Sequence, residues 1–245
     1  MLANERRRND ALKELGNNGE VDFFIADLSD QENVQDVIKK IKDKWESIDI
    51  LINNAGVLFN ELRMSKQDNE MHYEVNTLAP YMLTIGLKEM LLKSQNPIVV
   101  NTVTQGIQKL TLNVTELIKP TKFKEIMGGE FSSYMQSKNA LLLLMNTLSK
   151  DWKGVRIVNV HPGGNRTKMT TGDGMPFWLK LMVPLIGTAP IKGAKLIYNA
   201  AFDEKHKNKT GIYLQENKIT EMKSELSEVQ ENKLLAGVRT AHNIR

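Results

Sequence analysis

The sequence has no cysteine and only four histidines in 245 residues. The lack of cysteine excludes disulfide bridges, a thiolate nucleophile and a Cys-ligated zinc site, and so few histidines argue against a His-rich metal centre. We therefore expect no metal site. Long apolar runs are also missing, because the two longest, 140–145 and 177–190, are too short or too interrupted to span a bilayer, and the N-terminus is charged rather than signal-like. These absences predict a cytoplasmic protein without a membrane span.

A strong excess of one charge is absent as well. The 33 Lys and Arg residues are interspersed with 29 Asp and Glu residues, which gives a formal net charge of +4. The densest basic run, 205–209, stands between a helical pattern and a short apolar run and is typical of a solvated loop. We expect no nucleic-acid partner. The length and the 41% apolar composition favour a single globular domain spanning 1–245.

Apolar, strand-like segments alternate with helical patterns along the chain. The expected strands are 21–26, 48–52, 98–103, 155–160 and 211–214, of which 21–26 is predicted to be buried. The expected helices are 5–15, one that carries Val34, Val37 and Ile41, and then 68–92, 132–150 and 193–201. In the tail, helical spacing recurs at Ile219, Met222, Leu226 and Val229. Continuous apolar strands between amphipathic helices predict an α/β fold with a doubly wound parallel sheet of the Rossmann type.

Tyr134 and Lys138 are the first pair that suggests chemistry. They lie four residues apart on a predicted helix, so both side chains project from one face. An ammonium group beside a phenol favours the phenolate and lowers the tyrosine pKa toward the range that general acid/base catalysis uses. Chance alone supplies such a pair in many proteins of this size, so the surrounding motifs must decide.

Five motifs supply that context in a fixed order. A strand ends at Asn53-Asn54-Ala55-Gly56, the next helix contains Asn76, a strand end bears hydroxyl groups, a helix carries Tyr134-Met135-Gln136-Ser137-Lys138, and a later strand ends at Pro162-Gly163. Together they resemble the short-chain dehydrogenase/reductase family over essentially the whole chain. The segments 75–80 and 190–194 are similar to those of its retinol-dehydrogenase-type members. The resemblance implies an NAD(P)-dependent oxidoreductase that interconverts a carbonyl and an alcohol on a small-molecule substrate.

The resemblance also implies a role for each matching residue. Tyr134 would exchange a proton with the substrate oxygen, and Lys138 would lower the pKa of Tyr134 and bind the nicotinamide ribose. Asn76 would hold the water that links Lys138 to solvent. Asp27 matches the acidic position that contacts adenine, and Thr167 matches the hydroxyl that fixes the carboxamide. The full set of expected cofactor contacts is Asp27, Leu28, Asn53, Ala55, Gly56, Tyr134, Lys138, Pro162, Gly163 and Thr167.

The catalytic hydroxyl departs from the family pattern. The family usually has serine on the strand before the catalytic helix, whereas this chain reads Val99-Val100-Asn101-Thr102-Val103-Thr104. Alignment on Val-Val-Asn places Thr104 at the catalytic position, and a shifted register selects Thr102 or leaves Val103 there. Threonine can make the same hydrogen bonds as serine. We predict Thr104 as the catalytic hydroxyl, with Thr102 as the alternative.

A second departure concerns the phosphate site. The family's first strand, its Thr-Gly-x-x-x-Gly-x-Gly loop and the following helix have no counterpart before residues 1–4, which look like the end of the second strand. That loop normally brings backbone N–H groups and a helix N-terminus to the pyrophosphate. The chain is therefore expected to be an N-terminally truncated enzyme, or else a non-catalytic binding protein on a degenerate scaffold. The presence of Asn76, Tyr134 and Lys138 favours the enzyme.

The cofactor and the substrate are less closely defined. Arg6, Arg7 and Arg8 favour NADP over NAD if they meet a 2′-phosphate, although they equally suit the exposed face of a helix. The apolar residues after the Pro-Gly turn suggest either a loop that binds a lipophilic carbonyl or a helix that packs on its own core. These residues are Phe177, Trp178, Leu179, Leu181, Met182 and Val183. A homo-oligomer is an open alternative to a monomer.

Overall fold

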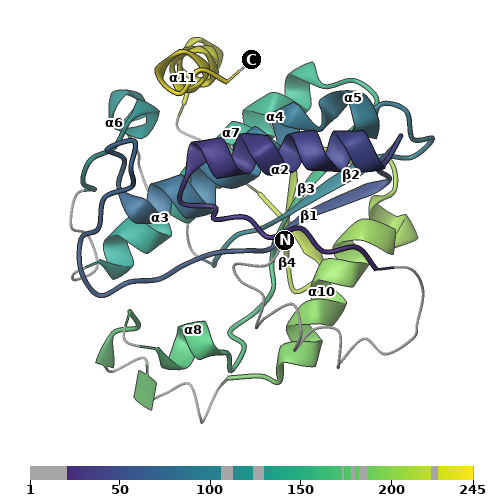
Figure 1. The fold of residues 1–245 in the computed structure, drawn as a ribbon. Helices are drawn as coiled ribbons and strands as arrows, with labels where there is room; N and C mark the ends of the chain where they lie inside the picture. The colour runs from purple at the N-terminus through teal and green to yellow at the C-terminus, as the bar shows by residue number, and fades with distance from the viewer. Residues whose placement is uncertain are drawn as a thin grey trace.

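The computed structural model describes residues 21–105, 113–123, 130–172, 174–177, 180–181, 187–221 and 226–244. Their centre is a five-stranded sheet in the order β1 (Ile50–Asn53), β2 (Ile98–Thr102), β3 (Arg156–His161), β4 (Ile212–Gln215) and β5 (Lys218–Thr220). The first four strands run parallel, and β5 is antiparallel to β4. Helices lie on both sides of the sheet (Figure 1). This arrangement confirms the predicted α/β fold.

Both faces of the sheet are covered, as apolar strands without polar alternation require. On one face Val99 packs into a core cluster with residues of α7 (Phe131–Asp151). On the other face Val100 packs with residues of α10 (Pro190–Phe202). Successive side chains of a strand point to opposite faces, so β2 contributes to both cores.

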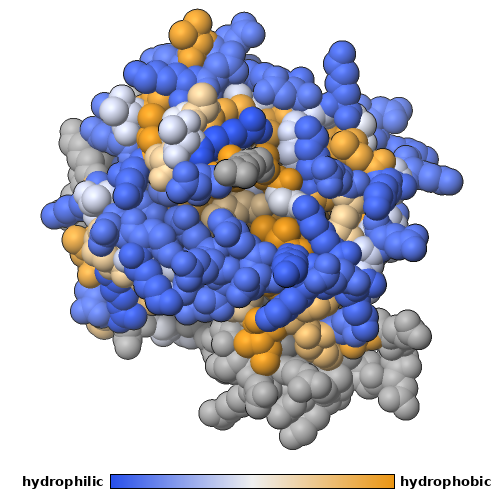
Figure 2. Space-filling model, turned by 45° about the horizontal axis from the view of Figure 1, so that its top comes forward, coloured by the Kyte–Doolittle hydropathy of each residue, from blue (hydrophilic) through white to orange (hydrophobic). Residues whose placement is uncertain are grey.

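Three further helices extend the first face. The buried residues of α2 (Gln31–Lys44) pack against α4 (Ala79–Gly86), as the helical spacing predicts. The last helix, α11 (Glu228–Ala241), lies beyond them. The side of the molecule formed by these helices is mainly hydrophilic, with small apolar patches scattered over it (Figure 2).

The predicted helix 68–92 forms but is not continuous. It comprises α3 (Met71–Tyr73), the π-helical turn η1 (Glu74–Leu78), α4 and α5 (Lys88–Leu91). Pro80 explains the irregular turn, because it has no N–H for the carbonyl of Asn76 and its ring would clash with that carbonyl in a regular helix. The wider π turn relieves the clash. It also contains Asn76, and π turns are frequent at functional sites.

Short helical segments lie outside the main layers. They are α6 (Val114–Ile118), α8 (Lys168–Thr171) and η3 (Glu204–His206). The basic run 205–209 falls in η3 and the turn after it, and its lysines are exposed, in agreement with the predicted loop. No helix among the described residues has the length and apolar character needed to cross a membrane. The predicted helix 5–15 lies outside the described residues.

The prediction of a buried strand at 21–26 is wrong. Of these residues only Ile25 makes a β-bridge, Val21 and Ile25 are 41% and 42% exposed, and Ala26 alone is buried. An isolated bridge does not make a strand, and no named strand in the described part of the chain pairs with this segment or with the outer edge of β1. Ile52 of β1 is 46% exposed.

The helical pattern expected in the tail is also wrong. Ile219 belongs to β5, Val229 in α11 is 78% exposed, and Met222 lies outside the described residues. Glu216 and Asn217 have φ angles of 50° and 60°, and two consecutive residues of positive φ suit the two-residue turn of a β-hairpin. The turn therefore pairs the residues that follow it, Lys218–Thr220, with β4, where the spacing of apolar residues suggested the start of a helix.

A ladder of three asparagines crosses the sheet at one level. Asn53, Asn101 and Asn159 stand in register on β1, β2 and β3. Asn53 Nδ2 donates to Asn101 Oδ1 at 2.8 Å, and Asn101 Nδ2 donates to Asn159 Oδ1 at 3.2 Å. Asn53 also donates to Thr84 Oγ1 of α4 at 3.1 Å. The ladder provides hydrogen-bond partners for amides that are buried in the sheet.

Replacement of Asn101, the central residue of the ladder, should destabilise the protein. Asn101→Ala leaves Asn159 Oδ1 without its donor in a buried site, so we expect the free energy of unfolding to fall by about 2–4 kcal/mol in urea denaturation. The matched control is Asn96→Ala, at an exposed position before β2, which should change it by less than about 0.5 kcal/mol. Equal effects of the two substitutions would contradict a stabilising ladder.

Candidate active site

Two cavities meet at the carboxyl ends of β2 and β3. One, of about 510 Å³, is lined by Asn54, Ala55, Gly56, Thr102, Lys138, Gly163, Thr167 and Gly193 among others. The other, of about 700 Å³, has a largely apolar surface, to which Leu58, Phe131, Met169, Met175 and Leu196 contribute, and Lys192, Lys195 and Glu216 also line it. Tyr134 lines both. Carboxyl ends of parallel strands are where α/β folds bind ligands, and the structure brings most of the predicted site residues together there.

The two threonines of the β2 region have different surroundings. The side chain of Thr104 lies near that of Tyr134 and lowers the pKa of its phenol, and the Thr104 carbonyl accepts a bond from Tyr213 Oη at 3.1 Å. Thr102 is buried, and its Oγ1 donates to the carbonyls of Asn53 and Asn54 at 3.3 and 3.4 Å. Thr102 therefore holds the turn after β1, and Thr104 is the hydroxyl that faces Tyr134.

Lys138 is almost completely buried beneath the smaller cavity. Its Nζ donates to the carbonyl of Thr102 at 3.0 Å, and burial lowers the pKa of its ammonium to about 8. Gly56 lies directly against it, because a Cβ on Gly56 would be 3.3 Å from Lys138 Nζ and 3.1 Å from Asn76 Oδ1. The absence of that Cβ leaves the floor of the cavity open next to the lysine.

The expected influence of Lys138 on Tyr134 is not found. Burial raises the pKa of the Tyr134 phenol to about 12, and the group that lowers it is Thr104 rather than Lys138. The reason is geometric, since the ammonium is directed to the Thr102 carbonyl. In this structure Tyr134 therefore stays protonated at neutral pH.

Asn76 uses its amide to join two segments. Its Oδ1 accepts the N–H of Val57 at 2.8 Å, and its Nδ2 donates to the Val57 carbonyl and to Ser137 Oγ, both at 3.1 Å. The loop after β1 is thereby fixed to α7. The predicted role of Asn76 in holding a water stays a prediction.

The Pro-Gly turn after β3 forms the opposite wall. Gly163 has a φ of 84°, a conformation that favours glycine. Asn165 Nδ2 donates to the carbonyls of Pro162 and Gly163 at 2.7 and 3.2 Å, and a Cβ on Gly193 would come within 2.3 Å of the same amide. No sequence pattern indicated this role of Asn165, because it depends on contacts with α10. The predicted Thr167 lines the cavity and caps α8, where it bonds with Thr170.

Asp27, the residue expected near adenine, and three further expected cofactor contacts lie farther along the sheet edge. Leu28, Asn53 and Ala55 line a cavity of about 380 Å³ beside β1. Asp27 is exposed next to Leu28, and its carboxylate accepts hydrogen bonds from the N–H and hydroxyl of Ser29 at 2.9 and 2.6 Å. Arg6, Arg7 and Arg8 lie outside the described residues.

The larger cavity also contains polar groups that no sequence pattern indicated. His161 is 9% exposed, its Nδ1 has no partner among the described residues, and burial lowers its pKa. Glu216 and Asn217 reach this cavity from the β4–β5 turn, which only the unpredicted hairpin creates. Of the apolar residues predicted either to bind a lipophilic substrate or to form a helix that packs on its own core, Phe177 and Leu181 are 76% and 60% exposed. Trp178, Leu179, Met182 and Val183 lie outside the described residues.

Comparison with known proteins gives a consistent family match. The short chain dehydrogenase family model matches residues 1–114. Polyprenol dehydrogenase from Danio rerio is 27% identical over 222 residues, which cover 86% of this chain and 66% of that protein. Retinol dehydrogenase 11 from Mus musculus is 27% identical over 199 residues, which cover 79% and 60%. The chain spans about half to two thirds of the length of the first curated relatives it matches.

A solved structure extends the similarity to the fold. A protein from Shigella flexneri 2a, assigned as a short chain dehydrogenase and complexed with NADP, is 23% identical with a TM-score of 0.65. The match covers 86% of this chain and 82% of that one. At this identity the likeness concerns the fold.

The buried ammonium of Lys138 should make the free energy of unfolding depend on pH. Its pKa is about 8 in the folded protein, against the ordinary lysine value of 10.5 expected for the unfolded chain. The unfolded chain therefore binds more protons between these two values, and stability rises with pH. Lys138→Met should be more stable than the parent below pH 8, by up to about 3 kcal/mol, and this advantage should shrink by pH 10. Urea denaturation of both proteins at pH 7 and pH 10 measures it. An advantage that does not change with pH would contradict the desolvated lysine.

Proposed function

We propose that this chain is a short-chain dehydrogenase/reductase, an NAD(P)-dependent oxidoreductase that interconverts a carbonyl and an alcohol. The observation that carries the proposal is the position of Tyr134, which lines both the cavity beside Lys138 and the apolar cavity beside Leu58. A proton donor at this boundary can contact a substrate in one cavity while the cofactor occupies the other.

The smaller cavity fits the nicotinamide end of such a cofactor. The open floor at Gly56, where a Cβ would press on Asn76 and Lys138, suits the flat face of a ring. We assign Gly56, Lys138, Pro162, Gly163 and Thr167 to this end. Leu28, Asn53 and Ala55 are assigned to the adenine end, with Asp27 beside them. When bound, the cofactor exchanges a hydride with the carbon that bears the substrate oxygen.

The chain's own residues then handle the proton. In reduction the Tyr134 hydroxyl gives its proton to the substrate oxygen, and Thr104 donates a hydrogen bond that orients that oxygen. The phenol pKa of about 12 keeps Tyr134 in the protonated form that reduction needs. We assign NADP, the cofactor that the Shigella protein holds, as the preferred partner.

The substrate we propose is a lipophilic carbonyl compound or alcohol. The larger cavity has a volume of about 700 Å³ and mainly apolar walls, and apolar walls favour apolar ligands. The names of two relatives, polyprenol dehydrogenase and retinol dehydrogenase, refer to lipophilic alcohols. The cytoplasmic location expected from the sequence belongs to the same proposal.

Removal of the phenolic proton is the direct test of this function. Tyr134→Phe should lower the turnover of 2-decanone with NADPH by at least about a hundredfold, because general acid catalysis contributes this much or more. The Kd for NADPH, measured by fluorescence titration, should stay within about threefold, since the ring remains. Turnover near that of the parent would contradict the role of Tyr134. A parent that binds NADPH but reduces no carbonyl would favour a non-catalytic binding protein.

The two threonines give a matched pair of variants. Thr104→Val removes the hydroxyl that faces Tyr134 and should lower kcat by about a hundredfold, whereas Thr104→Ser should retain activity. Thr102→Val removes a hydroxyl that bonds only backbone carbonyls, so it should lower stability slightly and leave kcat within about threefold. A larger loss of kcat in Thr102→Val than in Thr104→Val would reverse the assignment.

A further inference from the structure

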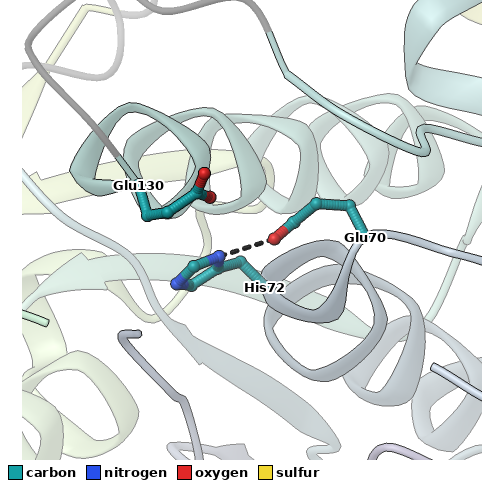
Figure 3. A group of neighbouring side chains, drawn as sticks. All are labelled: Glu70, His72 and Glu130. Carbon is teal, nitrogen blue, oxygen red and sulfur yellow. Dashed lines mark hydrogen bonds and ion pairs between the residues drawn. The ribbon is translucent and has the colours of Figure 1, made fainter. Parts of the chain in front are cut away.

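A histidine between two carboxylates lies behind the wall of the larger cavity. His72 and Glu70 are completely buried, and Glu130, the residue before α7, approaches them from the other side (Figure 3). One atom from each of the three side chains lies within 4.8 Å of the others. Such a cluster could hold a metal ion or form a hydrogen-bond network. The position of the proton on the imidazole distinguishes the two.

The hydrogen bonds of His72 define its tautomer. Its Nε2 accepts the backbone N–H of Phe59 at 2.9 Å, so the proton is on Nδ1, which donates to Glu70 Oε1 at 2.6 Å. A metal ion on Nδ1 would move the proton to Nε2, where it would oppose the N–H of Phe59. The geometry therefore points away from a metal site and toward a fixed acceptor for Phe59.

Glu70 fixes the imidazole in turn. Its second carboxylate oxygen accepts the N–H of Tyr73 at 2.9 Å at the start of α3, so both oxygens are engaged. The rings of Phe59 and His72 also lie against each other, with centroids 5.4 Å apart. A chain of contacts thus runs from α3 through Glu70 and His72 to the backbone of Phe59.

Leu58 lies between two such anchors. The N–H of Val57 is held by Asn76 Oδ1 at 2.8 Å, and the N–H of Phe59 is held by His72 at 2.9 Å. His72 and Asn76 are four residues apart in the same helical segment. Leu58 itself lines the larger cavity, and its backbone is close enough to Gly174 that a Cβ there would come within 2.4 Å of the Leu58 carbonyl.

We propose that His72 is a positioning residue that holds Leu58 in the wall of the substrate cavity through the N–H of Phe59. The inference rests on the proposed function, which makes the larger cavity the substrate site. The proposal predicts a selective effect. The affinity for a long substrate that reaches Leu58 depends on His72, whereas the affinity for a short substrate that stays near Tyr134 does not.

Two substitutions separate the hydrogen bonds of the imidazole. In His72→Gln the side-chain amide occupies the place of Nε2, so its oxygen can accept the Phe59 N–H. In His72→Asn the amide occupies the place of Nδ1, so it can donate to Glu70 but cannot reach Phe59. Both variants keep a polar group of similar size in the buried site.

The test combines amide exchange with ligand binding. We expect His72→Asn to accelerate hydrogen exchange of the Phe59 amide by about tenfold or more, as loss of one hydrogen bond would, and His72→Gln to leave it near the parent rate. In calorimetric titrations His72→Asn should raise the Kd for 2-decanone by about fivefold to tenfold and leave the Kd for 2-butanone unchanged. Thermal melts of both variants report any general loss of structure.

Several results would overturn the proposal. One is an unchanged exchange rate of the Phe59 amide in His72→Asn. Another is an equal rise of the Kd for both ketones in that variant, and the third is a parent protein that binds 2-decanone no more tightly than 2-butanone. Neither readout needs turnover, so failure of the proposed reaction, seen with Tyr134→Phe, is distinguishable from failure of this inference.

Discussion

The amide of Asn76 is the constraint on which the geometry of the site depends. It bonds Val57 through both backbone groups and Ser137 through Nδ2, so one side chain sets the loop after β1 relative to α7. Gly56 is thereby held against Lys138, and Leu58 is presented to the larger cavity. The π turn makes this possible, because it places a fully buried amide at the point where loop and helix meet.

Burial shapes the electrostatics around this anchor in two directions. It raises the pKa of the Tyr134 phenol and lowers that of the Lys138 ammonium, so both groups move toward their uncharged forms. The carbonyl of Thr102, which accepts a hydrogen bond from Lys138, and the side chain of Thr104 near Tyr134 compensate part of the cost. A bound cofactor would change this balance, which makes the site responsive to what occupies the cavity next to Lys138.

The sequence predicts local structure well where both sheet faces are buried. The bounds of β2, β3 and α7 agree with expectation within about one residue, because their apolar runs have no competing interpretation. The prediction of a strand at 21–26 fails because a strand also needs a pairing partner, which an apolar run does not reveal. The strand β5 was not predicted because the hairpin that forms it depends on two residues of positive φ. In the site, Tyr134 and Lys138 can be identified from the sequence by their four-residue spacing on a helix. His72 and Asn165 are not, since their roles come from Phe59 and from α10, which only the folded chain brings to them.

The asparagine ladder also limits how the strands can align. Asn101 lies on the same sheet face as Val99, and its neighbours Val100 and Thr102 lie on the other. A slip of β2 by one residue would exchange these faces and place the amide among Val158, Val160 and Leu214, with no asparagine opposite it. The buried polar row therefore discriminates against misregistered sheets during folding, at a position where three apolar strands would otherwise slide past one another with little penalty.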